Sequence, residues 1–361
     1  MREQVASGRA GAVALNVMEL GHASVFRDRI LVVGGTEPGD FTLPYNHATP
    51  KRGAILGISW PFWGRASDHY ADAVADTIAA HGCKLVEVHN RGRLFRRLAK
   101  RLGPGIRLCL YLHNDPQSME GLRAPLERAR LLDRASLVYC LSSYIRDRFI
   151  DGLEGPLERV VVLPNGMAPL PAERPPRQKS VIFVGRLIPE KGVGELFAAL
   201  RRIERELPDW RAVIIGRAPE RHRGRYERAR AELKTIWGER LSLRDSLPHA
   251  EVMQAFASAA IAVVPSRWQE PFGRTALEAL AAGCAVIASR SGGIPEIVGQ
   301  AGLLLDAVTP NSIADAILAL ARDPARREAL GRAGEARVAA CFEIGLLSHR
   351  LDAWRAGLLG H

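Results

Sequence analysis

The chain has 361 residues, of which 47% are hydrophobic and 25% are charged, a balance typical of a globular protein with room for two domains. It has no run of eighteen apolar residues and no apolar core near its start, so we expect neither a membrane-spanning helix nor a signal peptide and assign the protein to the cytoplasm. The formal net charge of +11 predicts an anionic partner, which could be nucleic acid, an acidic membrane surface or a phosphorylated substrate.

The first half of the chain alternates β-branched runs with helical periods from residue 52 onward, a pattern typical of an α/β protein with a parallel sheet. Helices are expected between the strands, for example at Ser67–Ala80 and Arg123–Leu132. At the start, Ser7–Gly11 leads directly into a helical pattern, so either this lobe lacks its opening strand or the start codon is misassigned. The predicted strands are Ala54–Ser59, Lys84–His89, Arg107–Leu112, Leu137–Leu141 and Val160–Leu163.

A proline-rich stretch then separates two series of strands. Met167–Lys179 holds four prolines and few apolar residues, which predicts an interdomain linker at 169–179. We therefore expect an α/β fold of two Rossmann-like lobes that face a cleft, with domains at 1–168 and 180–344 and a final helix, 345–361, that returns to the first lobe. The second series of predicted strands is Val181–Val184, Ala212–Ile215, Ser242–Arg244, Ile261–Val264, Ala285–Ala288 and Leu303–Leu305.

The strongest functional signal lies between Pro265 and Gly283, where a strand ends and an alanine- and leucine-rich helix begins near Gly273. Open α/β sheets bind ligands at the carboxyl ends of their strands, and a helix N-terminus offers free N–H groups to phosphate. Glu270 precedes the helix and Glu278 lies two turns along it, about 12 Å away if all eight residues are helical. A lone pair of glutamates at this spacing more often caps and solubilises a surface helix.

The context that favours a binding site is the segment Val181–Gly192. A buried strand ends there at Gly185, where the backbone can turn sharply, and Arg186 and Lys191 follow on the same loop. A guanidinium and an ammonium at a strand's carboxyl end can neutralise a diphosphate. Taken alone, these two residues are as readily explained as solvated surface cations.

Together these segments resemble the family-four retaining glycosyltransferases, a group that includes bacterial lipopolysaccharide, exopolysaccharide and phosphatidylinositol sugar transferases. The resemblance covers essentially the whole second lobe and is weaker in the first. It implies the two-lobed GT-B fold, an enzymatic activity, and a nucleotide-diphosphate-sugar donor, most often of UDP or GDP. The matching motifs are Gly185-Arg-Leu with Glu190-Lys-Gly192, Glu270-x7-Glu278, Gly292-Gly-Ile-Pro-Glu296, Tyr111-Leu-His-Asn114 and Leu163-Pro-Asn-Gly166.

The family pattern also implies roles for the matched residues. Arg186 and Lys191 would bind the donor diphosphate and stabilise the charge that develops on it. Glu270 would hold hydroxyls of the transferred sugar, and Glu278 would hold the ribose. His113, which follows a predicted strand of the first lobe, would lie near the reaction centre, although a lone histidine at a strand end is more often structural.

The resemblance places the remaining donor contacts on two loops of the second lobe. Backbone amides near Phe272, Gly273 and Arg274 would help to bind the diphosphate, and Gly216 and Arg217 would approach the base. The sequence departs from the family pattern at Asp245, where a glycine is common, which leaves the base undetermined.

No Asp-x-Asp tripeptide occurs in the chain, and the five cysteines are scattered without a Cys-x-x-Cys pair. We therefore expect no metal site and no cofactor beyond the donor substrate. Paired carboxylates act as nucleophiles in retaining glycosidases, so Glu270 could form a covalent intermediate. The family resemblance favours same-face displacement instead, in which the leaving phosphate accepts the acceptor's proton. The sequence leaves both mechanisms open.

A basic segment in the first lobe indicates which kind of acceptor the enzyme uses. Residues 91–107 hold seven basic and no acidic side chains, and the stripe of Leu94, Phe95, Leu98 and Leu102 predicts an amphipathic helix. This helix could meet anionic lipid or a phosphorylated glycolipid, on the inner face of the plasma membrane, or it could be a surface helix that packs on its own lobe. From the resemblance and this helix we expect a glycan or glycolipid acceptor in lipopolysaccharide or exopolysaccharide biosynthesis.

Two other classes of function compete with this interpretation. One is another GT-B enzyme, such as a sugar-nucleotide epimerase or a phosphorylase, but no pyridoxal-binding lysine site is recognisable. The other is a nucleic-acid-binding protein, suggested by charge alone. Aromatic residues make up only 6% of the chain and do not alternate with the basic runs, so we expect no nucleic-acid partner.

Overall fold

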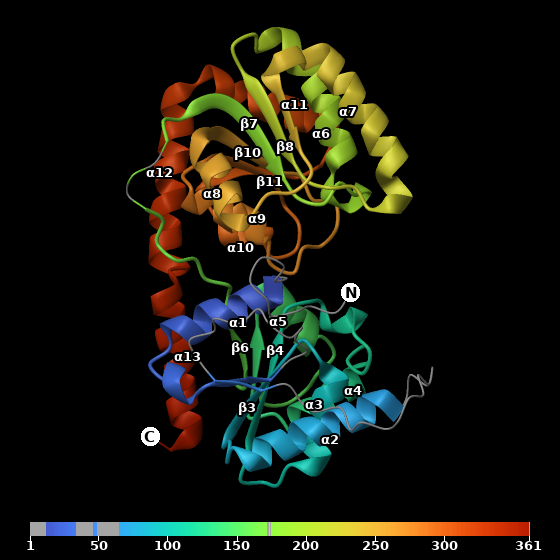
Figure 1. Ribbon diagram of the computed structural model, residues 1–361, viewed down its shortest axis with the longest axis vertical. Helices are drawn as coiled ribbons and strands as arrows, with labels where there is room; N and C mark the ends of the chain where they lie inside the picture. Colours follow the sequence, from blue (N-terminus) through green and yellow to red (C-terminus); the bar gives the residue numbers. More distant parts are fainter. Residues whose placement is uncertain (1–11, 34–45, 49–64, 172, 174, 361) are drawn as a thin grey trace. The chain divides into compact units, whose positions relative to one another are not determined.

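The computed structural model describes residues 12–33, 46–48, 65–171, 173 and 175–360. The predicted strand Ala54–Ser59 and the Ser7–Gly11 segment lie outside these residues. The chain divides into two compact units (Figure 1): unit 1 comprises Met1–Gly166 and Ile344–His361, and unit 2 comprises Met167–Glu343. Among the described residues, no helix has both the length and the apolar character needed to cross a bilayer.

Unit 1 is built on a parallel sheet in which four strands follow one another in chain order. Helices connect these strands, and a separate parallel pair, β1 and β2, precedes them. The strands are β1 (Leu31–Val33), β2 (Asn46–Ala48), β3 (Leu85–His89), β4 (Arg107–Leu112), β5 (Leu137–Cys140) and β6 (Val160–Val162). The helices are α1 (Ala12–Ala23), α2 (Arg65–Ala80), α3 (Gly92–Arg101), α4 (Pro125–Leu132), α5 (Ser143–Ile150) and α13 (Ile344–Leu359).

Unit 2 has a six-stranded parallel sheet in the order β12-β11-β10-β7-β8-β9. This is the doubly wound Rossmann order, in which the chain starts in the middle and reverses direction between its first and fourth strands, here β7 and β10. The strands are β7 (Gln178–Val184), β8 (Arg211–Ile215), β9 (Leu241–Arg244), β10 (Ala259–Val264), β11 (Ala285–Ser289) and β12 (Gly302–Leu305). The helices are α6 (Val193–Ile203), α7 (Arg223–Trp237), α8 (His249–Ser258), α9 (Arg274–Ala281), α10 (Ile294–Val298), α11 (Pro310–Arg322) and α12 (Pro324–Cys341).

The sequence prediction of two parallel α/β lobes is confirmed, but β1 and β2 were not predicted, and several other elements differ at their ends. Strand β7 begins three residues before the predicted Val181, because Gln178 pairs with Ala259 of β10 although its side chain is polar and exposed. In unit 1 the final helix α13 packs against α1.

The two faces of the unit 1 sheet differ sharply in chemistry. One face is apolar: Leu108, Leu110 and Leu112 of β4 pack in a core that also contains Phe95 and Leu98 of α3. The opposite face carries titratable and aromatic side chains, which alternate with the apolar ones because successive residues of a strand point to opposite sides. These side chains are Glu87, His89, Cys109, Tyr111 and Tyr139.

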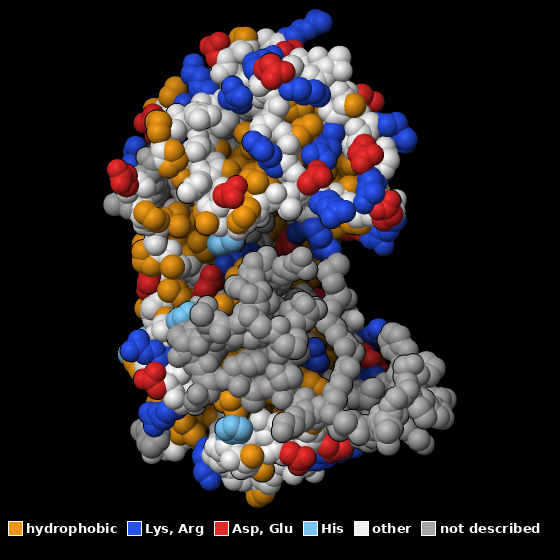
Figure 2. Space-filling model, in the orientation of Figure 1, with side chains coloured by type: hydrophobic (Ala, Val, Ile, Leu, Met, Phe, Trp, Pro, Cys, Tyr) orange, Lys and Arg blue, Asp and Glu red, His pale blue; other side chains and the backbone are white. Residues whose placement is uncertain are grey.

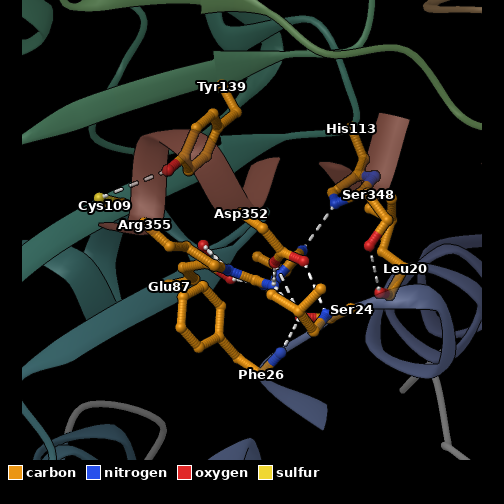
Figure 3. Close-up of polar contacts among 12 residues, drawn as sticks. Leu20, Ser24, Phe26, Glu87, Cys109, His113, Tyr139, Ser348, Asp352 and Arg355 are labelled. Atoms are coloured by element: carbon orange, nitrogen blue, oxygen red, sulfur yellow. Dashed lines mark hydrogen bonds and ion pairs between the residues drawn. The ribbon is translucent and has the colours of Figure 1, made fainter. Parts of the chain in front are cut away.

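Helix α13 covers the polar face through a buried network of charged groups (Figure 3). Arg355 donates from Nε to Oε1 of Glu87 at 3.0 Å and from Nη2 to Oε2 at 2.6 Å. A second carboxylate, Asp352, accepts from Nη1 of Arg355 at 3.1 Å and from the Ser24 hydroxyl, which follows α1, at 2.7 Å. Burial opposes ionisation of Glu87, but the charge and the hydrogen bonds of Arg355, with a smaller contribution from His89, together lower the pKa of this carboxyl.

Three stacked rings extend the polar face to the carboxyl ends of β3 and β4. The Tyr111 ring lies 4.5 Å from that of His113 and 5.0 Å from that of His89, and both pairs are stacked. Nδ1 of His89 and Nε2 of His113 are 3.0 Å apart, within hydrogen-bonding distance. Burial lowers the pKa of His89 to about 4 and lowers the pKa of His113 as well, so both rings are neutral near pH 7.

We predict that Arg355→Met lowers the free energy of unfolding by about 3–5 kcal/mol, because it leaves the carboxylates of Glu87 and Asp352 buried without their counter-charge. The effect is measured as a shift in the urea midpoint of unfolding. The matched control is Arg350→Met on the same helix, where the arginine is exposed. Equal losses for the two variants would contradict the prediction.

Stability should also fall as the pH drops from about 6.5 to about 4. Unfolded histidine binds a proton near pH 6.5, whereas folded His89 does so only near 4, so acid favours the unfolded chain within this window. The contribution is fully present above about pH 6.5, and at about 1.4 kcal/mol per pH unit its loss amounts to about 3 kcal/mol. Urea unfolding across this range should show a shallower fall for His89→Gln. The exposed His81→Gln should keep the wild-type slope, and identical slopes for both variants would be incompatible with a buried neutral His89.

Candidate functional site

The loops that follow β7 and β10 meet in unit 2, at the point where the strand order reverses. After β7 the chain passes Arg186, whose side chain is exposed, and forms a short 3-10 helix, Pro189–Lys191, ahead of α6. The Lys191 ammonium contacts Oε1 of Glu270, which follows β10. The backbone N–H of Arg267 also donates to the Glu190 carbonyl at 2.8 Å, so both backbone and side chains join the loops.

Gly192 allows this close approach. Its φ of 67° lies in the left-handed region, and a Cβ at this position would overlap the carbonyl oxygen of Pro265. The glycine of the Glu190-Lys-Gly192 motif is therefore explained by its contact with Pro265, directly after β10, because only a residue without a side chain fits against that carbonyl.

Glu270 is held from three directions. Its Oε1 accepts from the Ser266 hydroxyl at 2.5 Å in addition to the Lys191 contact. Its backbone carbonyl accepts from the N–H of Gly293 at 2.8 Å, and Gly292, with a φ of 55°, packs directly against its backbone. The Gly292–Glu296 motif, for which the sequence suggested no role, thus positions Glu270.

Glu278 lies within α9 and is buried. Its Oε1 accepts from Nε of Arg274 at 3.0 Å and lies 2.9 Å from Nε2 of His249, the first residue of α8. As predicted, Glu270 precedes the helix, but Glu278 does not lie two turns along it. Helix α9 begins at Arg274, so Glu270 belongs to the loop and Glu278 lies about one turn into the helix, because Gly273 adopts a φ of 106° that interrupts helical geometry.

The N-terminus of α9 follows Glu270 closely in the chain. Gly273, which has no side chain, is the N-cap residue of this helix. Phe272 is buried and packs edge-on against Phe342, with ring centroids 6.3 Å apart. The helix therefore presents backbone N–H groups and the positive end of its dipole at the same sheet edge as Lys191.

Gly216 and Arg217 follow β8, the neighbour of β7. The Gly216 N–H donates to the Arg244 carbonyl at 2.8 Å, and Arg217 is exposed. Asp245, at the end of β9, accepts from Nη1 of Arg230 at 2.7 Å, and this bond lowers its pKa. At the position where the family often has a glycine, this chain therefore has a carboxylate that is paired with an arginine and lies at the same edge of the sheet.

His113 is part of unit 1 and follows β4. It is buried, and its backbone N–H donates to Oδ1 of Asn90 at 3.2 Å, so the loops after β3 and β4 are tied together. Its ring is neutral, stacked on Tyr111 and paired with His89.

The basic segment 91–107 does not present its apolar stripe to the surface. Phe95 and Leu98 of α3 are buried in the core of unit 1, as expected for a helix that packs on its own lobe. Arg93 and Arg101 form ion pairs with Glu120 and Asp72. Insertion of this stripe into a lipid layer would therefore require the helix to leave its core, and only its charged side could meet an anionic partner.

Within the described part of the chain, no three His, Cys, Asp or Glu side chains gather as a metal-binding group. The expectation of a reaction without a metal remains a prediction, since it concerns activity.

Sequence reasoning missed three polar residues of these sites. Ser266 and His249 contact the two glutamates, but a serine or a histidine at the start of a helix carries no distinctive sequence signal. His89 was recoverable, because it ends the strand before that of His113, and the carboxyl ends of parallel neighbours lie at one edge of the sheet.

Two family profiles match most of the chain. Residues 171–337 match the profile of glycosyl transferases group 1, and residues 29–169 match that of glycosyltransferase family 4. A Bacillus subtilis protein described as the putative glycosyltransferase YtcC is 27% identical over 291 residues, which cover 74% of this chain and 70% of the relative. A Mycobacterium tuberculosis GDP-mannose-dependent alpha-(1-6)-phosphatidylinositol monomannoside mannosyltransferase is 32% identical over 251 residues, 63% of each chain.

The chain spans less than two thirds of that mannosyltransferase and 44% of a similar one from Corynebacterium glutamicum. Among solved structures, a sucrose-phosphate synthase from Thermosynechococcus elongatus superposes with a TM-score of 0.77 at 21% identity and covers 99% of this chain and 96% of its own. The Anabaena protein HepE in complex with UDP gives 0.76 at 21% identity, with 99% and 100% covered. At this level of identity the structures show the fold.

Both profiles, the relatives and the paired parallel sheets agree with the motifs of the second unit. The chain therefore belongs to the family-four glycosyltransferases, enzymes of the GT-B fold that take a nucleotide-sugar donor.

Proposed function

We propose that this enzyme transfers a sugar from a UDP- or GDP-linked donor to a glycan or glycolipid of the cell envelope, with retention of configuration and without a metal ion. The observation that carries the donor site is the contact of Lys191 with Glu270 at the switch point of the unit 2 sheet, beside the N-terminus of α9. A cation, the backbone amides of a helix N-terminus and a buried carboxylate at one sheet edge suit a diphosphate that carries a polyhydroxylated sugar.

The roles of the individual groups follow from their chemistry. Lys191, the exposed Arg186 and the amides at Phe272–Arg274 would bind the diphosphate and stabilise the charge that develops as it leaves. Glu270 would accept hydrogen bonds from sugar hydroxyls. Glu278, whose Oε1 is already engaged, would accept from the ribose through its other oxygen.

The base and the acceptor are inferred from related proteins. By its name, the mycobacterial relative depends on GDP-mannose and acts on a phosphatidylinositol mannoside, while HepE was crystallised with UDP. Gly216 and Arg217 would face the base. A lipid-linked acceptor at the cytoplasmic face of the membrane suits the exposed cations of α3, which supports a role in lipopolysaccharide or exopolysaccharide biosynthesis.

Retention is proposed to proceed by same-face displacement, with the leaving phosphate accepting the proton of the acceptor hydroxyl. In this scheme His113 acts at the transferred sugar as a hydrogen-bonding group. The contact of Lys191 with Glu270 supports this scheme over a covalent one, because a carboxylate paired with an ammonium is a weakened nucleophile.

A thermal-shift screen with UDP, GDP, ADP and dTDP, each with and without EDTA, tests the donor site. We expect one nucleotide to raise the Tm, EDTA to leave that shift unchanged, and Arg186→Ala and Glu278→Ala to abolish it. If no nucleotide shifts the Tm, the proposed donor site is wrong. If EDTA removes the shift, the metal-independent mechanism is wrong.

Lys191→Ala should weaken nucleotide diphosphate binding by about 10- to 100-fold, since it removes a charge-assisted contact of roughly 1.5–3 kcal/mol. Isothermal titration with the nucleotide identified above measures the Kd. Lys179→Ala serves as the control, because this lysine is exposed and pairs only loosely with Asp209, at 3.7 Å. A change of less than threefold in the Kd of Lys191→Ala would show that the Lys191 ammonium does not bind the diphosphate.

A further inference from the structure

The contact between His89 and His113 has no role in the proposed function, yet its geometry is specific. The two histidines follow or end adjacent parallel strands, and the backbone around them is fixed by two bonds: the Asn90 N–H donates to the Tyr111 carbonyl at 2.7 Å, and Oδ1 of Asn90 accepts from the His113 N–H at 3.2 Å. Asn90 has a φ of 57°, a left-handed conformation that asparagine tolerates better than most residues. This turn keeps His89 and His113 at one sheet edge.

Tyr111 fixes the plane of both imidazoles. Its hydroxyl donates to the Leu163 carbonyl at 2.8 Å, which anchors the phenol ring. The interplanar angles of this ring are 10° to His113 and 19° to His89, so both imidazoles stack on the anchored ring, and their own planes differ by 29°. The 3.0 Å contact between Nδ1 of His89 and Nε2 of His113 joins them.

A hydrogen bond between two neutral imidazoles contains one proton, so the tautomers of the two rings depend on each other. If His89 carries its proton on Nδ1, Nε2 of His113 accepts and the His113 proton lies on Nδ1. If His113 donates from Nε2, His89 carries its proton on Nε2. In either arrangement the free nitrogen of His113 has one defined hydrogen-bonding character, donor or acceptor.

We propose that His89 is a positioning residue for His113, which it holds in a single tautomer and ring orientation through the Nδ1–Nε2 hydrogen bond. The kinetic part of this inference rests on the proposed function, in which His113 acts at the transferred sugar. The tautomeric part depends only on the structure of unit 1.

The first experiment needs no substrate. In protein labelled with ¹⁵N at histidine, the two ring nitrogens of His113 should resonate far apart at pH 7.5, as expected for one neutral tautomer, and His113→Ala identifies them. His89→Phe keeps a ring against Tyr111 but removes the hydrogen bond, so the two resonances should move together toward averaged positions. His89→Gln, which can still hydrogen-bond, should reverse part of this change. Averaged resonances in the wild type would overturn the proposal even if neither variant folds.

The second experiment measures release of the nucleotide with the donor found by thermal shift. His89→Phe should lower kcat by about 10- to 100-fold with the donor KM within twofold, and His89→Gln should recover part of the loss. In the His113→Ala background, His89→Phe should have no further effect, because it acts through His113. Additive losses would mean that His89 serves the fold alone.

The outcomes separate the two proposals. A wild-type enzyme that turns over no donor contradicts the proposed function, while the ¹⁵N spectra still decide whether His89 fixes His113. An active enzyme in which His113→Ala loses activity but His89→Phe does not contradicts only the role of His89.

Discussion

The contact between Lys191 and Glu270 is the interaction on which the second unit depends most directly. Glu270 is buried, and a buried carboxylate is costly without a cation and hydrogen-bond donors. Lys191 and Ser266 supply both, and each comes from a loop that is fixed by a glycine or by backbone bonds. Three sequence motifs far apart in the chain therefore converge on one side chain, and the reversal of strand order between β7 and β10 creates the place where they can do so.

Unit 1 solves the same electrostatic problem on a larger scale. The polar face of its sheet would be destabilising if it were left under an apolar helix, because Glu87 has to be ionised inside the protein. The C-terminal helix supplies Arg355, and Asp352 in turn satisfies the remaining guanidinium donor and the end of α1. Replacing such a network as a whole by apolar residues can be neutral for stability, whereas removing one member is not. The network therefore determines that α13 is the helix that packs on this face, and it adds little net stability.

The strands were predictable to within a few residues wherever a β-branched run ended at a glycine or a proline. Periodicity did not reveal that β7 starts at Gln178, because its first residues are polar and pair only through the backbone. The start of the helix near Gly273 was predicted, but Glu278 lies about one turn into this helix and not two, because the helix begins only at Arg274. The candidate residues of unit 2 were predictable from motifs. His249 was not predicted, since it becomes a neighbour of Glu278 only when α8 and α9 pack together, whereas His89 was missed although it ends the strand before that of His113.

The net charge of +11 predicted an anionic partner, but several arginines hydrogen-bond groups within the protein instead. Arg128 is buried and donates to the carbonyls of Leu122 and Phe149, and Arg177 donates to those of Ala259 and Ala282. On the face shown in Figure 2, basic and acidic side chains of unit 2 are interspersed. A count of basic residues therefore overstates the charge available to a partner. The cation that matters for a diphosphate is defined by position, and Arg186, exposed beside the β7–β10 switch point, is one whose charge pairs with no acidic side chain among the residues described.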